Sequence, residues 1–273
     1  MKVKWLLGKD VFRENIELFA EEIQRQGMEY RYIEYVPFSD DFSFEGYAPE
    51  DCVVFYGSIG QANQIRHKAK WIPGIFYSKK AYDCRNYYPA LGKHILNKNY
   101  MMIPYGDLSR QRDFIFEKLG VDNTVFIRPD YGGKSFTGTL AYLETFDKFL
   151  EVVGYGQLDP ETLLVVAEPK NIKNEWRFLV VEDNVVTGSQ YRSEHGIKYD
   201  ANYPQEAYAV AEIAAKLYHP DKAWVVDICE TKNGDFHILE IGSFSCAGLY
   251  LCDREKVIRE VSRVAYEEWK EYQ

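Results

Sequence analysis

The sequence predicts a mixed α/β chain in which a small open α/β domain precedes a longer α+β region. Three observations lead to this prediction. Strand and helix patterns alternate over roughly the first 90 residues, the pattern changes near Met101, and two hairpins follow in the second half of the chain. Within the first domain, strands are predicted at residues 2–7, 30–36 and 52–56. Between the first two strands, apolar residues recur at helical spacing and Gly27 follows as a helix end.

The composition is that of a globular protein. Of the 273 residues, 46% are hydrophobic and 27% are charged, which excludes a disordered tail, a collagen-like fibre and a membrane bundle. The net charge of -9 gives no strong nucleic-acid signal, because duplex binders usually carry a basic surplus; only a local basic groove is left open. The chain has no long apolar run and no signal-peptide pattern. Five scattered cysteines without a CxxC pair predict reduced thiols and a cytoplasmic location.

Beyond Met101, helices and strands are predicted in a different order. Helices are expected at residues 107–119 and 146–153, and strands at 125–128, 136–141 and 163–167, the last ending at Glu168. A helix over residues 204–217 separates two hairpins, and a final helix begins near Asp253. Residues 57–70 are predicted to form the solvent-exposed start of a helix. The alternative is a loop that faces the substrate.

The first informative hairpin covers residues 223–241, where Asn233-Gly234 is a strong turn signal. A two-residue turn there would set these pairs: Cys229 with Ile238, and Asp227 with Glu240. Two carboxylates opposite each other on apolar strands repel. A divalent cation would remove the repulsion, and Mg²⁺ prefers one or two carboxylates together with phosphate oxygens. We therefore expect Asp227 and Glu240 to bind metal; the alternatives are a protonated pair or separate salt bridges.

A second hairpin is predicted over residues 175–192, with a two-residue turn at Asp183-Asn184. The turn would pair Trp176 with Tyr191, Arg177 with Gln190, and Glu175 with Arg192. One face would then carry Glu175, Arg177, Gln190 and Arg192, and the core face would carry Trp176, Phe178, Val180, Thr187, Ser189 and Tyr191. The charged face is either a solvated surface or the floor of an anion site, and the carboxylates of the first hairpin favour the anion site.

A glycine-rich loop follows Arg128, in the order Pro-Asp-Tyr-Gly132-Gly133-Lys134-Ser135. The glycines let backbone N–H groups approach phosphate oxygens, and Lys134 can reach a β- or γ-phosphate. The loop is not a Walker A motif, because that motif needs glycine at position 128 and a helix afterwards. The alternative interpretation is a flexible hairpin tip.

Four segments, taken in order, resemble the ATP-grasp superfamily: FIRPDYGGKSFTG, VVAEP, EWRFLVVEDNVVTGSQYR and WVVDICETKNGDFHILEIG. In that fold two α+β lobes hold ATP between them. The resemblance implies an N-terminal domain at residues 1–95, a first lobe at 96–170 and a second lobe at 171–273. The positions of Arg128, Lys134 and Arg177 are similar to the clade named for two arginines and one lysine, which has many phage and bacterial members.

The resemblance also implies site roles. ATP phosphates would contact Arg128, Lys134 and the loop residues Gly132, Gly133 and Ser135; Glu168 would lie beside adenine and Glu175 beside ribose. Lys134, Arg177 and Arg192 would be catalytic, with Arg192 stabilising the transferring phosphoryl group or the acyl phosphate. Asp227 and Glu240 match the family's metal carboxylates. The usual Glu-x-Asn is here Glu240-Ile241-Gly242, so Ser243 or Ser245 would have to replace the third ligand.

The function implied by the resemblance is an ATP- and Mg²⁺-dependent carboxylate–amine ligase. ATP would phosphorylate a carboxylate, and an amine would displace phosphate from the acyl phosphate. The carboxylate and the amine would belong to small molecules, peptides or proteins. Positioning and charge neutralisation carry most of phosphoryl transfer, so no nucleophilic side chain is required. Two alternatives are a small-molecule kinase of the same fold and a nucleotide-binding module with weak or no catalysis.

Overall fold

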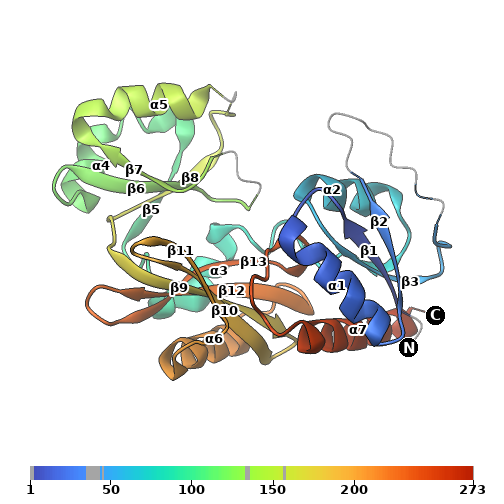
Figure 1. Cartoon of the computed structure of the whole chain (residues 1–273). Helices are drawn as coiled ribbons and strands as arrows, with labels where there is room; N and C mark the ends of the chain where they lie inside the picture. The colour runs from blue at the N-terminus through green and yellow to red at the C-terminus, as the bar shows by residue number, and fades with distance from the viewer. Residues whose placement is uncertain (1–2, 35–43, 45, 133–135, 156–157, 273) are drawn as a thin grey trace.

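The computed structural model describes residues 3–34, 44, 46–132, 136–155 and 158–272. The strands form three sheets (Figure 1). The first is parallel and belongs to the N-terminal domain, in the order β2-β1-β3-β4. Its elements are β1 Val3–Gly8, α1 Arg13–Arg25, β2 Glu29–Ile33, β3 Cys52–Tyr56, α2 Ile59–Lys68 and β4 Ile72–Gly74.

The helix predicted from residue 57 is confirmed as α2. Ser58 accepts a hydrogen bond from the Gln61 backbone, and the Gln61 side chain reaches back to the Ser58 backbone. This capping box fixes the start of the helix. Gln61 is fully buried, with its amide donating to the Ile33 carbonyl, so this side chain does not face a substrate.

The first lobe contains an antiparallel sheet in the order β5-β8-β6-β7 and has its own apolar core. Its elements are β5 Tyr100–Pro104, α4 Arg112–Leu119, β6 Thr124–Pro129, β7 Thr139–Tyr142, α5 Phe146–Gly154 and β8 Leu163–Ala167. The predicted helix at 107–119 begins later than expected, because residues 105–107 form a 3₁₀ turn instead.

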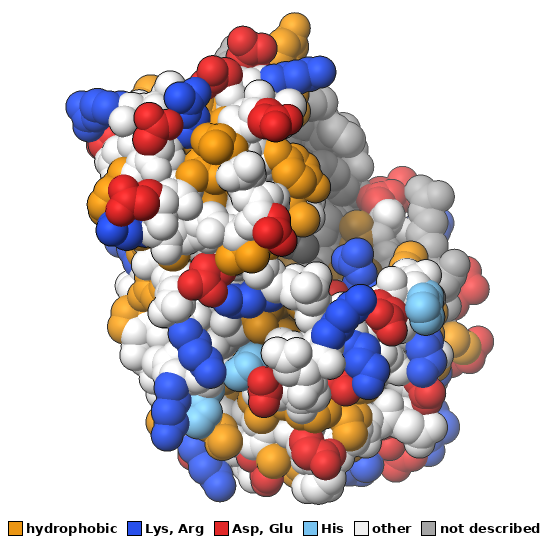
Figure 2. Space-filling view, turned by 90° about the vertical axis from the view of Figure 1, so that its left-hand side faces the viewer, with side chains coloured by type: hydrophobic (Ala, Val, Ile, Leu, Met, Phe, Trp, Pro, Cys, Tyr) orange, Lys and Arg blue, Asp and Glu red, His pale blue; other side chains and the backbone are white. Residues whose placement is uncertain are grey.

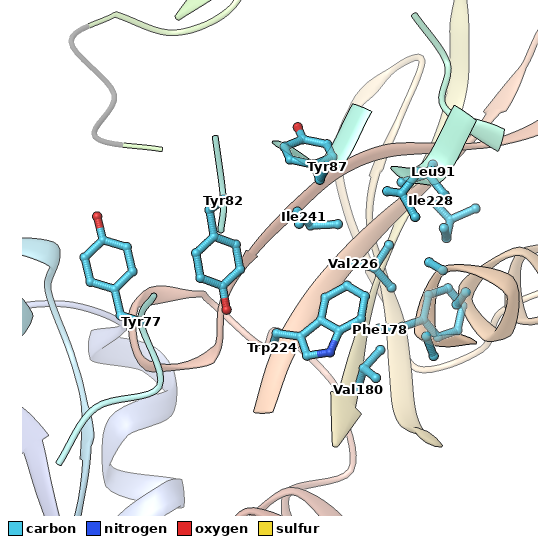
Figure 3. Packing of buried hydrophobic residues seen from close by; sticks show 14 of the residues in the cluster. Tyr77, Tyr82, Tyr87, Leu91, Phe178, Val180, Trp224, Val226, Ile228 and Ile241 are labelled. Carbon is cyan, nitrogen blue, oxygen red and sulfur yellow. The ribbon is translucent and has the colours of Figure 1, made fainter. Parts of the chain in front are cut away.

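The second lobe is built on the antiparallel sheet β11-β10-β9-β12-β13. Its elements are β9 Ile172–Val181, β10 Asn184–Ser193, β11 Gly196–Asp200, α6 Gln205–Leu217, β12 Ala223–Thr231, β13 Phe236–Ser243 and α7 Arg254–Glu271. Helix α6 and the earlier helix α3 (Cys84–Leu91) cover the face shown in Figure 3, which carries Phe178, Val180, Trp224 and Val226. The helix predicted to begin near Asp253 is α7; Asp253 caps it, and Val257, Val261 and Val264 are buried.

Both predicted hairpin turns are wrong, although one predicted pair of site residues is right in each hairpin: Asp227 with Glu240, and Glu175 with Arg192. In the first hairpin Glu230 pairs with Phe236 and Cys229 with His237, because a three-residue loop ends at Gly234 with φ of +85°. A bulge next to Asp227 then adds Leu239 to the opposite strand. It restores the predicted pairing of Asp227 with Glu240.

The second hairpin turns at Glu182-Asp183, since Val181 pairs with Asn184. Arg177 therefore faces Ser189 and Trp176 faces Gln190, not the predicted partners. Two bulges, at Val186 and Tyr191, restore the pairing of Glu175 with Arg192. The predicted faces change accordingly: Gln190 lies on the side of Trp176, whereas Thr187, Ser189 and Tyr191 lie on the side of Arg177.

The N-terminal domain and the second lobe share apolar cores. Helix α7 returns to lie beside α1 (Figure 1), and Trp5 donates a hydrogen bond to Ser262 of α7. Near the end of β13, Ser243 donates to the Phe76 carbonyl at 2.8 Å, and Ser245 accepts from the Phe76 N–H at 2.9 Å. These contacts fix the N-terminal domain against one side of the second lobe.

Asp221 also joins the N-terminal domain to the second lobe. Its Oδ2 atom accepts hydrogen bonds from the Ser78 N–H at 2.8 Å and from the Tyr82 hydroxyl at 2.7 Å. Burial raises the pKa of this carboxyl from 3.8 to about 6, with the two hydrogen bonds opposing the change.

We expect Asp221 to make stability depend on pH. The folded state holds its proton more tightly than the unfolded chain, so the stability contribution is present below a pH of about 4 and is lost as the pH rises through about 6. The shift corresponds to about 3 kcal/mol. Urea unfolding of the wild type and of Asp221→Asn should show the wild type losing that amount relative to the variant across this window. If the free energies of unfolding of the two proteins change in parallel with pH, the pH dependence comes from a group other than Asp221.

All five cysteines have free thiols, and four of them are buried. No helix in the described parts of the chain is long and apolar enough to cross a membrane. On the face that Figure 2 shows, acidic and basic side chains are interspersed over both lobes rather than gathered by sign.

Candidate active site between the two lobes

A cavity of about 350 Å³ lies where the three parts of the chain meet; we call it the interlobe cavity. The first lobe lines it with β6, β7 and the residues after β6, and the second lobe with β9, β10, β12 and β13. The N-terminal domain and the segment that follows it add Ile59, Tyr77, Tyr82, Leu96 and Asn97. Of the predicted site residues, the structure brings these to the cavity: Arg128, Gly132, Glu175, Arg177, Arg192, Asp227 and Glu240.

Asp227 is the most deeply placed charge in the cavity, at 1% exposure. Arg177 donates to both of its oxygens at 2.7 Å, in a bidentate ion pair between neighbouring strands. Burial raises the pKa of Asp227 and the Arg177 contacts oppose that rise. Burial lowers the pKa of Arg177, but Asp227 reverses this effect and holds it well above its usual range. The guanidinium thus positions Asp227 through two of its nitrogens, and the third donates to the Gly248 carbonyl at 3.0 Å.

Tyr191 completes this buried network, and the sequence-based prediction had placed it in the core. Its hydroxyl donates to Glu175 at 2.6 Å and lies 3.2 Å from Asp227. Its ring, with that of Tyr250, lies about 5.5 Å from the Arg177 guanidinium. The bulge at Tyr191 explains its position, because a bulge redirects a side chain next to a site. Burial raises the pKa of Glu175, and Tyr191 and Arg192 offset part of the rise.

Glu240 forms the second ion pair of the cavity, with Arg128 of the first lobe at 3.1 Å. The predicted conflict between Asp227 and Glu240 is therefore met by two arginines, one for each carboxylate. This arrangement is the salt-bridge alternative stated above. Both carboxylates nevertheless line one cavity as cross-strand neighbours. Among the described residues, no group of three or more His, Cys, Asp or Glu side chains is placed to hold a metal ion.

The glycine-rich loop is described only up to Gly132, so Gly133, Lys134 and Ser135 lie outside the described residues. The loop begins at a rigid point. Asp130 is fully buried, its carbonyl accepts from Cys84 N–H at 2.7 Å, and its carboxylate accepts from the Arg85 N–H at 2.7 Å and pairs with the Arg85 guanidinium. The start of α3 therefore holds Asp130, and the residues Tyr131 and Gly132 that follow it line the cavity.

Three predicted residues differ in how they relate to the cavity. Arg192 lines it with a side chain that is 62% exposed, 3.7 Å from Glu175. Glu168 does not line the cavity; it pairs with Lys170, which does. Ser243 lines the cavity, but its hydroxyl and that of Ser245 are used by Phe76, so neither replaces the usual asparagine in this arrangement.

Apolar side chains also line the interlobe cavity, and the sequence analysis does not assign them to a site. Phe126 and Leu140 are register neighbours in the first lobe, and Ile172 and Leu239 lie opposite in the second lobe. Cys246 also lines the cavity, but burial raises the pKa of its thiol to about 12. It is therefore protonated at neutral pH and unsuited to act as a nucleophile.

Solved structures of the same architecture show which fold the chain has. D-cycloserine synthetase DcsG superposes with a TM-score of 0.68 at 13% identity, over 96% of this chain and 99% of that chain. D-alanine–D-alanine ligase from Bacillus anthracis, complexed with ATP, gives 0.62 at 12% identity, with 100% of each chain covered. The ATP-grasp ligase PsnB, with minimal precursor, Mg and ADP, gives 0.59 at 12% identity, over 98% of each. The chain thus has the ATP-grasp fold.

The family is more specific than the fold. The profile described as ATP-grasp domain, R2K clade family 2, matches residues 111–259, more than half of the chain. The protein belongs to this family. No curated protein matches its sequence.

Proposed function

We propose that the protein is an ATP-dependent ligase that joins a carboxylate to an amine through an acyl phosphate. The observation that carries the proposal is the meeting of Arg128, Arg177, Asp227 and Glu240 in one cavity between two lobes. Such preorganised charges suit phosphoryl transfer, in which positioning and electrostatic stabilisation provide most of the catalysis. The apolar walls around Phe126 would take the adenine base.

Asp227 and Glu240 fit Mg²⁺, because their side chains are oxygen donors on one wall and this ion takes one or two carboxylates plus phosphate oxygens. When bound, Mg²⁺ would neutralise charge on the β- and γ-phosphates. Glu240 would then exchange its contact with Arg128 for the ion, and Arg128 would turn to the phosphate oxygens. Arg177 would keep Asp227 in place, since each of its three guanidinium nitrogens already donates a hydrogen bond in that position.

In the proposed reaction, a carboxylate oxygen attacks the γ-phosphorus, the bond to the β-phosphate bridging oxygen breaks, and ADP leaves. The amine nitrogen then attacks the acyl carbon, inorganic phosphate leaves, and the nitrogen loses a proton. Arg128, Lys134 and Arg192 would donate hydrogen bonds to the phosphoryl oxygens. Glu175 would accept hydrogen bonds from the ribose hydroxyls, in a position set by Tyr191.

ATP with Mg²⁺ should raise the melting temperature of the protein, because a ligand that binds only the folded state stabilises it by mass action. At about 100 times the dissociation constant the stabilisation is about 2.7 kcal/mol. Differential scanning fluorimetry with ATP, with and without EDTA, measures the shift, and the EDTA sample should show a smaller one. The absence of a shift at millimolar ATP would contradict nucleotide binding.

The reaction type is tested by product analysis with ATP, Mg²⁺, a panel of free amino acids and short peptides, and hydroxylamine. A ligase should form a hydroxamate, because hydroxylamine captures the acyl phosphate, and should release free phosphate only when an acceptor is present. A stable phosphorylated product would identify a kinase. Binding of ATP without any turnover on this panel would argue against the proposed ligase and favour a binding module.

A further inference from the structure

A second cavity, of about 240 Å³, lies beside the interlobe cavity between the N-terminal domain and Asp221. Its apolar walls come from Ile65 of α2, Trp71 and Ile75, and its polar groups include Arg66, Ser78 and Asp221. At about 30 Å³ for each water, the space equals about eight water molecules. This volume is sufficient for a free amino acid.

The second cavity has charges of opposite sign in its lining. The Arg66 guanidinium lies 4.8 Å from the centre of the Tyr77 ring, and among the described residues it has no ion-pair partner. The positive charge of Arg66 lowers the pKa of Asp221, but no ion pair within 4.0 Å joins these two described residues. A molecule between them could pair with both charges at once.

Asp221 also has unused hydrogen-bonding capacity. Both of its donors, the Ser78 N–H and the Tyr82 hydroxyl, bond to the same oxygen, Oδ2. The other oxygen, Oδ1, has no partner in the described parts of the chain. Asp221 is half-buried, and its Oδ1 atom can accept a hydrogen bond from a charged donor of a ligand. An ammonium group is such a donor.

Two tyrosines separate this cavity from the interlobe cavity. Tyr77 lines both cavities, and Tyr82 lines the interlobe cavity while its hydroxyl holds Asp221. Their rings are stacked with centroids 6.2 Å apart, and the hydroxyls point in opposite directions (Figure 3). A ligand in the second cavity would therefore lie one aromatic layer away from the site that would bind ATP.

We propose that the second cavity binds a free α-amino acid. The carboxylate of the ligand pairs with Arg66, the ammonium group pairs with Asp221, and the side chain contacts Trp71, Ile65 and Ile75. Binding itself does not depend on the ligase function proposed above. If that function holds, the amino acid is either the amine substrate or an effector, and turnover distinguishes these two roles.

The test is isothermal titration of the full chain, without ATP, using alanine and leucine in both enantiomeric forms as probes. N-acetyl-leucine and leucinamide each lack one of the two charges. We expect saturable binding of at least one amino acid, and a loss of about tenfold or more in affinity for both blocked compounds, since a charge-assisted hydrogen bond contributes about 1.5–3 kcal/mol. No saturable binding at millimolar concentrations would overturn the proposal.

Two variants test whether the ligand binds in the second cavity. Asp221→Asn retains one oxygen that can accept from both Ser78 and Tyr82, so it preserves the local fold while removing the charge. Asp221→Asn and Arg66→Gln should each weaken binding about tenfold or more. Asp183→Asn removes the same charge from an exposed turn and should bind as the wild type does. Unchanged affinity in both cavity variants would overturn the proposed site.

The two roles are separated by adding ATP and Mg²⁺ to the amino acid that binds. Incorporation of that amino acid into a product identifies it as the amine substrate, whereas a change in turnover without its consumption identifies an effector. The titration is done without ATP and does not require turnover. If the ligase reaction fails, the titration therefore still decides whether the second cavity binds an amino acid. Conversely, a ligase that acts on other amines without binding any probe amino acid would contradict this inference alone.

Discussion

Replacing Asp227 with asparagine should abolish metal-dependent turnover and lower the free energy of unfolding by about 3–5 kcal/mol, because one partner of a buried ion pair is removed. Arg177 would remain buried with its charge no longer balanced. The carboxylate repulsion inferred from the sequence predicts a variant that is as stable as the wild type or more stable. The bidentate contact of Arg177 reverses that expectation.

Glu240→Gln is the matched control for this prediction. It also removes one of the two carboxylates, so turnover should again be lost. Its side chain is 31% exposed and meets Arg128 at 3.1 Å, so we expect a change in stability of about 1 kcal/mol or less. Urea unfolding and ADP release measured on both variants give the comparison. Wild-type turnover in both variants would show that the carboxylates are structural and do not bind metal.

Arg128→Lys and Lys134→Ala should have different kinetic signatures. Arg128 lies on β6, next to Pro129, and its planar guanidinium can hold two phosphate oxygens, which an ammonium group cannot do in the same way. Arg128→Lys should therefore mainly raise the KM for ATP. Lys134 belongs to the glycine-rich loop and is proposed to follow the γ-phosphate as charge develops. Lys134→Ala should lower kcat by roughly 10²-fold or more, the usual cost of a lost transition-state donor.

Steady-state kinetics on both variants test this assignment. Lys170→Ala provides a control, because Lys170 also lines the interlobe cavity but pairs with Glu168 rather than with a carboxylate at the charged end. It should affect KM for ATP and leave kcat close to that of the wild type. A kcat near the wild-type value for Lys134→Ala would show that the loop lysine takes no part in the chemical step.

Two strands that the sequence predicts with the correct bounds are almost continuously buried. Cys52–Tyr56 is buried at every position, and so is most of Leu163–Ala167, as expected for strands within packed sheets. The pairing of Asp227 with Glu240 was also predictable. A two-residue turn, however, does not produce this pairing. The actual turn shifts the register by one residue, and the bulge at Leu239 shifts it back.

The position of the Tyr191 side chain could not be predicted from the local sequence pattern. Strict alternation places it with Trp176 on the core face, and only the bulge moves it beside Glu175 and Asp227. A bulge depends on the strands and side chains around it, which lie far away in the chain. The pairing of Arg128 with Glu240 has the same origin, because it joins two lobes through residues more than one hundred positions apart.

The shared core of α1 and α7 has a consequence for synthesis of the chain. Domains usually fold as units in the order in which they leave the ribosome. Here Val3, Trp5 and Ile16 belong to one cluster with Val257, Val261 and Ala265, so the N-terminal domain keeps an apolar face uncovered until α7 is made. The first lobe, whose core spans only residues 103–166, can complete its packing earlier. During synthesis, the first lobe is therefore expected to complete its folding before the N-terminal domain does, although it is made later.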